Sequence, residues 1–177
     1  RRVLFRSGSF IVSSIRRRNL LRQLERMSYR DQLTQFGNRY AVDWFVEHEW
    51  NGEQIGVVYC DITGLKKVND EQGHEAGDRL IIRACECLAG VFKGYGLYRI
   101  GGDEFLVLCL GIEEKDLREH VEKLRMDMKE HQVTMAVGMI WKEHGPKDID
   151  LLLNESERLM YEDKDRYYKE HGLKRRR

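Results

Sequence analysis

The sequence predicts an α+β fold in which helices flank a central, mainly antiparallel sheet, with a linker helix at the N-terminus. Three observations predict this fold. The continuous apolar run "IGVVYCDI" (55–62) is typical of a buried central strand. Two further apolar segments, "GLYRI" (96–100) and "EFLVLCL" (104–110), flank a pair of glycines and predict a hairpin. Helical patterns separate these strands, as in "KDLREHVEKLRMDMKEH" (115–131), whose apolar residues recur three or four apart.

The elements that precede the central strand are helical. Residues 9–28 contain neither Gly nor Pro and predict a helix with a narrow apolar stripe formed by Leu20, Leu24 and Met27. That stripe fits a short coiled-coil linker and packing on the chain's own domain equally well. A second helix is predicted over residues 38–49, where Asn38 is a suitable cap.

After the central strand, a short helix is expected over "LKKVNDEQ" and a longer one from Glu75 to Ala89, with a break at Gly73. The segment "VTMAVGMIW" (133–141) predicts another strand, and the last helix is expected over residues 148–170. We therefore divide the chain into a linker or signalling helix (1–28), one globular domain (29–172) and a basic tail (173–177).

Composition narrows the functional classes. The 31 Lys and Arg residues balance 30 Asp and Glu residues, so net charge gives no indication of a nucleic-acid partner. No apolar run approaches the length of a membrane span. The four cysteines form no C-x-x-C pair, and we expect Cys60 and Cys109 to be buried thiols in a reducing compartment. The chain reads as cytoplasmic, and its start at Arg1 without Met fits the cytosolic part of a larger protein.

Three acidic residues occur where apolar strands end. Asp61 closes the central strand, and Asp103 and Glu104 lie at the hairpin turn. If these strands are neighbours, the carboxylates converge at one sheet edge, where their repulsion favours a bound cation. Mg²⁺ suits such a site, because it takes one or two carboxylates and completes its shell with phosphates. The alternatives are an ordinary turn at the glycines and a cap or solvated charge at Asp61.

Gly101 and Gly102 separate the two hairpin strands. Without side chains they let a triphosphate lie against the backbone, and they tolerate the positive φ that a two-residue hairpin turn requires. Next to the central strand, residues 65–80 offer polar groups suited to a nucleotide. Asn and Asp side chains can read a guanine edge and a lysine can neutralise phosphate; these residues are Lys66, Asn69, Asp70, His74 and Asp78. For Asp70 the surface-charge interpretation is preferred, and His74 fits a helix-capping or core histidine as well as a substrate contact.

Four motifs together resemble the GGDEF family of diguanylate cyclases over about residues 29–172. They are "DQLTQFGNRY", "DITGLKKVNDEQGHEAGD", "RIGGDEF" and "MYEDKDRYY". The resemblance implies a nucleotidyl-cyclase, palm-like fold and an Mg-dependent enzyme that joins two GTP molecules into cyclic di-GMP and pyrophosphate. It also implies two Mg²⁺ ions per active site, with Mn²⁺ as the alternative ion.

The resemblance assigns roles residue by residue. Metal ligands are expected at Asp61, the Ile62 carbonyl, Asp103 and Glu104. Catalytic roles are expected for Asp103, Glu104 and Lys66. Substrate contacts are expected for guanine and for the phosphates, at Asn69, His74, Asp78, Gly101, Gly102 and Lys164. Each domain would bind one GTP, so the resemblance implies a C2 homodimer, switched by the N-terminal helix and by an upstream sensory domain.

The sequence also departs from the family pattern. The product-inhibition motif R-x-x-D is absent, because its two positions hold Phe92 and Tyr95. Thr63, Gln35 and Tyr168 stand where the family usually has an acid, a glycine and an arginine. We therefore expect a diguanylate cyclase without feedback through that site. The alternative is a catalytically inactive module that binds GTP or cyclic di-GMP; a scaffold domain or a mixed GMP–AMP cyclase agrees less well with Asn69 and Asp78.

Overall fold

A computed structural model describes residues 29–172 of the chain, so the predicted helix 9–28 and the basic tail lie outside the described residues. The described part is a four-stranded sheet of order β2-β3-β1-β4, in which all neighbouring strands are antiparallel. Its elements are α2 (Arg39–His48), β1 (Ile55–Ile62), α3 (Leu65–Gln72), α4 (His74–Val91), β2 (Gly96–Arg99), β3 (Glu104–Leu110), α5 (Glu114–Glu130), β4 (Met135–Lys142) and α6 (Asp150–Glu170). The predicted α+β class is confirmed.

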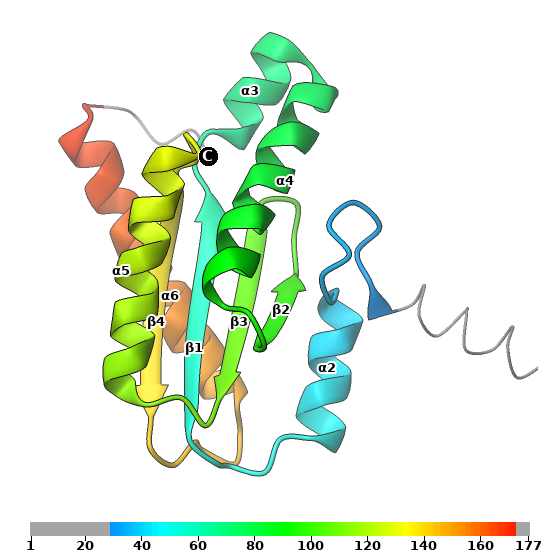
Figure 1. Ribbon diagram of the computed structural model, residues 1–177, viewed down its shortest axis with the longest axis vertical. Coiled ribbons are helices and arrows are strands. Elements are labelled where there is room, and N and C mark those ends of the chain that lie inside the picture. Colours follow the sequence, from blue (N-terminus) through cyan, green and yellow to red (C-terminus); the bar gives the residue numbers. More distant parts are fainter. Residues whose placement is uncertain (1–28, 173–177) are drawn as a thin grey trace, which may run out of the picture.

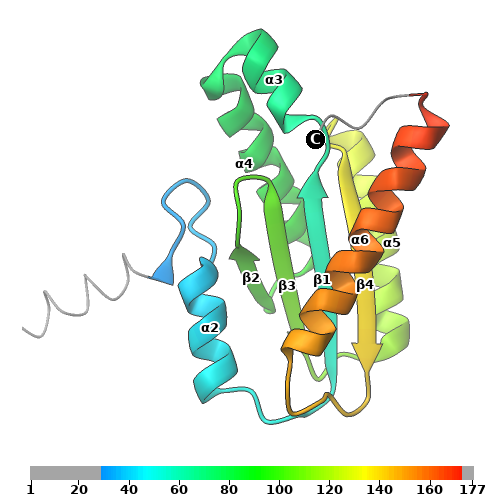
Figure 2. The ribbon, with the colours of Figure 1, turned by 180° about the vertical axis from the view of Figure 1, so that it is seen from behind.

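The central strand β1 is buried along its whole length, as its apolar sequence predicts. Helices α4 and α5 cover one face of the sheet, and α6 crosses the other face (Figures 1 and 2). Successive β1 side chains alternate between the two layers: Val58 and Cys60 pack under α4 and α5, whereas Val57 and Tyr59 pack on the α6 side. Since both faces are covered, β1 needs apolar side chains at every position rather than at alternate ones.

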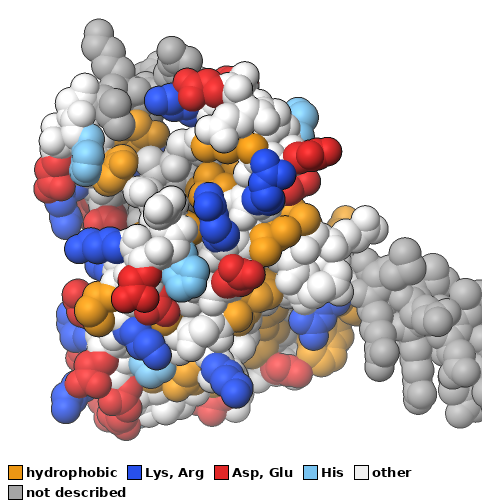
Figure 3. Space-filling view, turned by 45° about the horizontal axis from the view of Figure 1, so that its top comes forward, with side chains coloured by type: hydrophobic (Ala, Val, Ile, Leu, Met, Phe, Trp, Pro, Cys, Tyr) orange, Lys and Arg blue, Asp and Glu red, His pale blue; other side chains and the backbone are white. Residues whose placement is uncertain are grey.

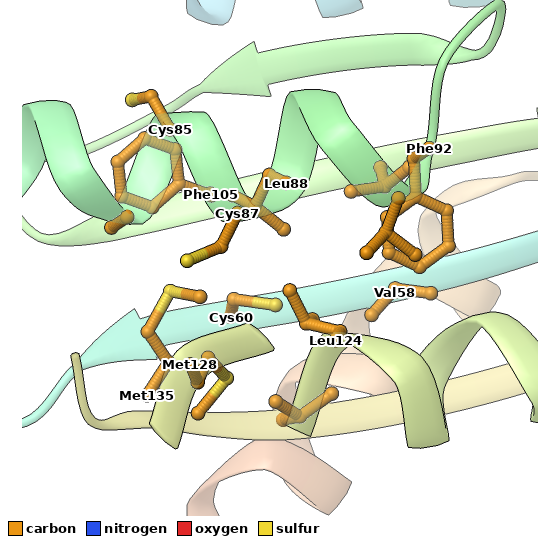
Figure 4. Close-up of a cluster of buried hydrophobic side chains, with 14 of the residues drawn as sticks. Val58, Cys60, Cys85, Cys87, Leu88, Phe92, Phe105, Leu124, Met128 and Met135 are labelled. Carbon is orange, nitrogen blue, oxygen red and sulfur yellow. The ribbon is translucent and has the colours of Figure 1, made fainter. Parts of the chain in front are cut away.

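The larger core layer lies between the sheet and helices α4 and α5 (Figure 4). In it, Cys60 and Phe105 from the sheet meet Leu88 from α4 and Leu124 from α5. All four cysteines are free and buried, as expected for Cys60 and Cys109. Burial raises the pKa of the Cys60 and Cys109 thiols to about 12, so they remain protonated and inert at neutral pH.

The hairpin turn differs from the predicted two-residue type. The connection between β2 and β3 runs over residues 100–103, and neither Gly101 nor Gly102 adopts a positive φ. The amide groups of Ile100 and Gly101 both donate to the Glu104 carbonyl oxygen, at 3.0 and 3.4 Å, and this closes the wider loop. An added Cβ at position 101 would lie 2.5 Å from Glu104 Oε2, so a side chain there would displace the Glu104 carboxylate.

Helix α6 approaches the sheet closely at Gly138 of β4. A Cβ at this position would overlap the Ser156 carbonyl oxygen and the Met160 amide nitrogen of α6. The glycine therefore permits direct contact between the helix backbone and the strand. This contact fixes the height of α6 above the sheet and places its C-terminal half beside the end of β1.

Candidate functional site

Four chain segments meet at one end of the sheet. The end of β1, the β2–β3 turn, the start of α3 and the C-terminal half of α6 lie at the same end of the molecule (Figures 1 and 2). The Ile62 amide donates to the Asp103 carbonyl oxygen at 2.9 Å, which ties the turn to the end of β1. The predicted convergence of Asp61 with the turn acids at one sheet edge therefore agrees with the strand order.

Asp61 and Glu104 are directly opposite each other in the β1–β3 ladder. Opposed residues of an antiparallel pair point to the same face, which here is the face that α6 covers. Asp61 is only 4% exposed. Burial raises the pKa of Glu104, and the neighbouring charges of Asp103, Asp61 and Glu157 raise it further. Several negatively charged side chains thus lie close together in a partly buried environment.

Lys164 supplies the positive charge at this site. Its Nζ lies 2.6 Å from Asp61 Oδ1, and the two side chains are 13% and 6% exposed. The ammonium group also lowers the pKa of Glu104, against the effect of the surrounding carboxylates. A residue that the sequence assigns to substrate phosphate is therefore an internal counter-charge for the principal candidate metal ligand.

The residue before Lys164 anchors this part of α6. Asp163 Oδ2 accepts a hydrogen bond from the Val137 amide of β4 at 2.9 Å and another from Arg125 Nη2 of α5 at 3.2 Å. Asp163 thus connects α6 to the outer edge of β4 and to the helix on the opposite face. The backbone at Lys164 is held in register with the sheet.

Arg99 braces the glycine turn from the other side. Its guanidinium group donates to the Gly102 carbonyl oxygen at 2.7 and 3.3 Å and to Asp31 Oδ1 at 3.1 Å. Asp31 also accepts from the amide and hydroxyl groups of Thr34. Burial acts to raise the pKa of Asp31, but these hydrogen bonds and the Arg99 charge together lower it. The entry segment and the turn are held as one unit by this ionised carboxylate.

The α3–α4 hairpin carries the predicted guanine-binding residues. Asn69 of α3 is packed against Gly77 of α4, where a Cβ would overlap the Asn69 Oδ1 atom. Asp78 follows on α4 and is exposed, as is Lys66 on α3. His74 is the first residue of α4 and is also exposed, so it is not a core histidine, and the N-cap of the helix is Gly73.

The donor set at the sheet end is suited to a hard cation. Between residues 29 and 172, no three His, Cys, Asp or Glu side chains are grouped closely enough to hold a metal ion. The Lys164 ammonium nevertheless occupies a cation position against the buried Asp61 carboxylate. All candidate ligands are oxygen atoms, which Mg²⁺ prefers. The chemistry of these oxygen donors therefore fits Mg²⁺.

Glu157 and Tyr161 are part of the site but were not predicted from the sequence. Both lie on α6, seven and three residues before Lys164, which places them on the same helical face. The charges of Glu104 and Glu157 act on Tyr161, whose pKa is raised mainly by burial. Their helical spacing to Lys164 could have indicated from the sequence that they share a face with it. That face belongs to the site only because α6 lies over Asp61, which the sequence does not show.

Aromatic side chains occupy the positions of the missing R-x-x-D motif. Phe92 is fully buried, and its ring lies 5.6 Å from that of His120, which also meets Tyr95 at 6.1 Å. Neither residue can supply the ion pairs that an arginine and an aspartate offer a phosphate.

On the face shown in Figure 3, acidic and basic side chains are interspersed, which gives no single-sign patch for a nucleic acid. Between residues 29 and 172, no helix combines the length and apolar character that a membrane span requires.

Comparisons with known proteins concern the family and the fold of the chain. The family model "Diguanylate cyclase, GGDEF domain" matches residues 28–169. The bifunctional diguanylate cyclase/cyclic di-GMP phosphodiesterase MucR of Pseudomonas aeruginosa is 29% identical over 172 residues, which cover 89% of this chain. The cyclic di-GMP phosphodiesterase PdeR of Escherichia coli is 30% identical over 175 residues, 90% of this chain. The chain spans 25% of the length of each of these relatives.

The fold comparison extends over nearly the whole chain. The crystal structure of the coiled coil and GGDEF domain of DgcB from Caulobacter crescentus, in complex with c-di-GMP, matches with a TM-score of 0.82. The match covers 98% of this chain and 97% of that one at 20% sequence identity. At this level of identity the likeness is one of fold.

Proposed function

Because the chain belongs to the diguanylate cyclase GGDEF-domain family, we propose that it condenses two GTP molecules into cyclic di-GMP, with release of pyrophosphate. One observation carries the proposal: the buried Asp61 and the Asp103–Glu104 turn meet at the sheet end from which the α3–α4 hairpin projects. This arrangement supports the proposal, because a phosphoryl-transfer site and a base-reading site would be adjacent.

Each group of residues has a role in this reaction. The ribose 3′-oxygen of one GTP attacks the α-phosphorus of the other, so catalysis consists mainly of positioning and charge stabilisation. Asp61, Asp103, Glu104 and the Ile62 carbonyl would hold Mg²⁺, which when bound offsets the charge on the phosphoryl oxygens. The Asp103–Glu104 pair would accept the proton of the 3′-hydroxyl group. Burial and the neighbouring Asp103 raise the pKa of Glu104, which makes its carboxylate a better proton acceptor than an exposed glutamate.

Substrate binding is assigned to the residues around this centre. Asn69 and Asp78 would read the guanine edge, with His74 beside them at the start of α4. Lys66 would neutralise phosphate and assist catalysis. A Cβ on Gly102 would meet no atom within 4 Å, which supports its role as an open stretch of backbone for the triphosphate.

The proposed domain, residues 29–172, acts as a C2 homodimer in the cytoplasm. Residues 1–28 join it to an upstream sensory domain. It lacks product feedback through the positions of Phe92 and Tyr95.

The test is the reaction itself. Purified protein is incubated with GTP and Mg²⁺, and the nucleotides are separated by chromatography. Cyclic di-GMP is expected from the natural sequence and at least a 100-fold lower rate from Asp103→Ala, because the turn acid holds both metal and proton. Asp70→Ala is the matched control, since Asp70 is an exposed acid on α3 and its replacement is expected to leave turnover within twofold.

A second function is favoured by one specific observation. The Lys164 ammonium occupies the cation position at Asp61, and this arrangement suits a metal-free module that binds GTP or cyclic di-GMP without catalysis. If no product forms at protein concentrations that enforce dimers, calorimetric titration with both nucleotides distinguishes this module from a chain that binds neither. Saturable binding without turnover would replace the cyclase proposal.

A further inference from the structure

We propose that Lys164 is a built-in counter-cation that holds Asp61 until a nucleotide triphosphate arrives, so that metal and nucleotide enter the site together. The proposal rests on the proposed function, because it concerns the metal and triphosphate of that same site. It adds an order of events: the triphosphate draws the ammonium group away, and only then does Asp61 take a metal ion.

The ion pair itself is the first argument. Lys164 Nζ and Asp61 Oδ1 are 2.6 Å apart, with both side chains largely shielded from solvent. Separating a buried ion pair is costly unless new interactions replace the one that is lost. A metal ion alone supplies a partner for Asp61 but repels the displaced ammonium. A triphosphate with its metal ion supplies partners for both groups.

The second argument is that the exchange requires only a side-chain movement. Asp163 fixes the helix next to Lys164 through the Val137 amide and Arg125, and the close contact of α6 with Gly138 fixes its distance from the sheet. The lysine ammonium, in contrast, sits on a flexible four-carbon stem. Lys164 can therefore turn from Asp61 to phosphate while the helix stays in place.

The third argument is charge balance. The negative charges of Asp103, Asp61 and Glu157 all act on Glu104, and the positive charge of Lys164 opposes them there. If a divalent ion entered without phosphate, the site would hold the ion and the ammonium together. Phosphate oxygens remove that conflict. The metal-free, nucleotide-free protein is thus expected to bind divalent ions weakly at this position.

The experiment measures Mn²⁺ binding without nucleotide, by the EPR signal of the free ion, in the full chain. Lys164→Met is expected to bind Mn²⁺ at least tenfold more tightly than the natural protein, because Asp61 is left without its ammonium partner. Lys169→Met removes a positive charge from the exposed side of the same helix and is expected to change the affinity by less than twofold. Equal affinities for the natural protein and Lys164→Met would overturn the proposal.

Two further variants keep the test decisive if Lys164→Met folds poorly. Lys164→Arg retains a cation at Asp61 and is expected to bind Mn²⁺ as weakly as the natural protein; tighter binding by this variant would contradict the proposal. The double variant Asp61→Asn/Lys164→Met removes both charges and is expected to lose the tighter Mn²⁺ binding of Lys164→Met completely. Mg²⁺ alone should raise the melting temperature of Lys164→Met more than that of the natural protein, and an equal rise would contradict the exchange.

The proposed function can fail independently. Cyclic di-GMP production by the natural protein, combined with unchanged Mn²⁺ affinity in Lys164→Met, would retain the cyclase and reject the exchange. Tighter Mn²⁺ binding by Lys164→Met, in a natural protein that makes no product, would retain the counter-cation role and reject the cyclase.

Discussion

Gly77 and Asn69 are in contact across the α3–α4 hairpin, so closely that a single added carbon on Gly77 would overlap the Asn69 Oδ1 atom. The contact fixes the direction of an amide that we assign to guanine recognition. In the proposed base site, Asn69 can therefore keep this position only if residue 77 is glycine.

Gly77→Ala is expected to weaken GTP binding about tenfold or more, because the new methyl group displaces Asn69 and one bidentate-type contact is worth about 1–3 kcal/mol. Isothermal titration with a non-reactive GTP analogue measures the loss. Gly90→Ala, in the same helix, is the control, since its Cβ would have 4.0 Å to the nearest atom, Asp127 Oδ2. An affinity that Gly77→Ala leaves unchanged would show that Asn69 does not read the base.

The two glycines of the turn are expected to behave differently. Gly102→Ala should leave the melting temperature unchanged, because its Cβ meets no atom within 4 Å, yet lower GTP turnover at least tenfold by filling the space of the triphosphate. Gly101→Ala should lower both the melting temperature and the turnover, because its Cβ would lie 2.5 Å from Glu104 Oε2 and would displace that carboxylate. Thermal melts and initial rates of both variants test this difference. Full activity of Gly102→Ala would remove the turn from the substrate site.

Glu104 predicts a pH-dependent stability. Its pKa is raised from the ordinary value of 4.5, mainly by burial and then by Asp103, so the folded state binds the proton more tightly than the unfolded state. The stabilising contribution is present below pH 4.5 and is lost as the pH rises through the higher folded-state pKa. Glu104→Gln should therefore have the same unfolding free energy as the natural protein at pH 4 and a higher one at pH 7. Urea denaturation in EDTA at both pH values is the measurement; a difference that does not change with pH would contradict it.

Gly138 is expected to be the most sensitive glycine of the sheet. Gly138→Ala should destabilise the protein by about 3 kcal/mol, because the methyl group meets helix backbone at Ser156 and Met160 that cannot move aside. Gly56→Ala is the comparison, since there the nearest atoms are ends of the flexible Leu117 side chain and the cost should be smaller. Chemical denaturation ranks the two variants. A reversed order would mean that α6 is not held at β4.

Between residues 29 and 172, the strands and helices were predicted nearly to the residue from hydrophobic patterns. The run 55–62 is β1 and the run 104–110 is β3, because both positions need apolar side chains on two faces. The turn was predicted less well: glycine pairs suggest positive φ, whereas neither Gly101 nor Gly102 adopts it, and Gly101 instead faces the Glu104 carboxylate. In the entry segment, Gln35 adopts a positive φ of 61° where the family usually has glycine.

The contacts that complete the site were beyond sequence reasoning. Lys164 and Asp61 are 103 positions apart, and their pairing depends on where α6 crosses the sheet. Asp163 reads as a surface acid in a charged helix, yet it accepts from a strand amide and from Arg125. Such roles follow from the distance between a helix and a strand edge, which Gly138 sets and which no periodicity in the sequence encodes.

The Asp163 contact also bears on the resistance of the protein to aggregation. β4 is an outer strand, and an outer strand with open amide groups can recruit a strand from another molecule, as in the growth of aggregates. Asp163 takes up the Val137 amide in the middle of that row. On the opposite border, the Gly37 amide bonds to the Leu97 carbonyl and the Arg99 amide to the Gly37 carbonyl, which covers β2. Both outer strands of the described sheet thus have backbone groups that are already hydrogen-bonded, which disfavours edge-to-edge pairing with a second molecule.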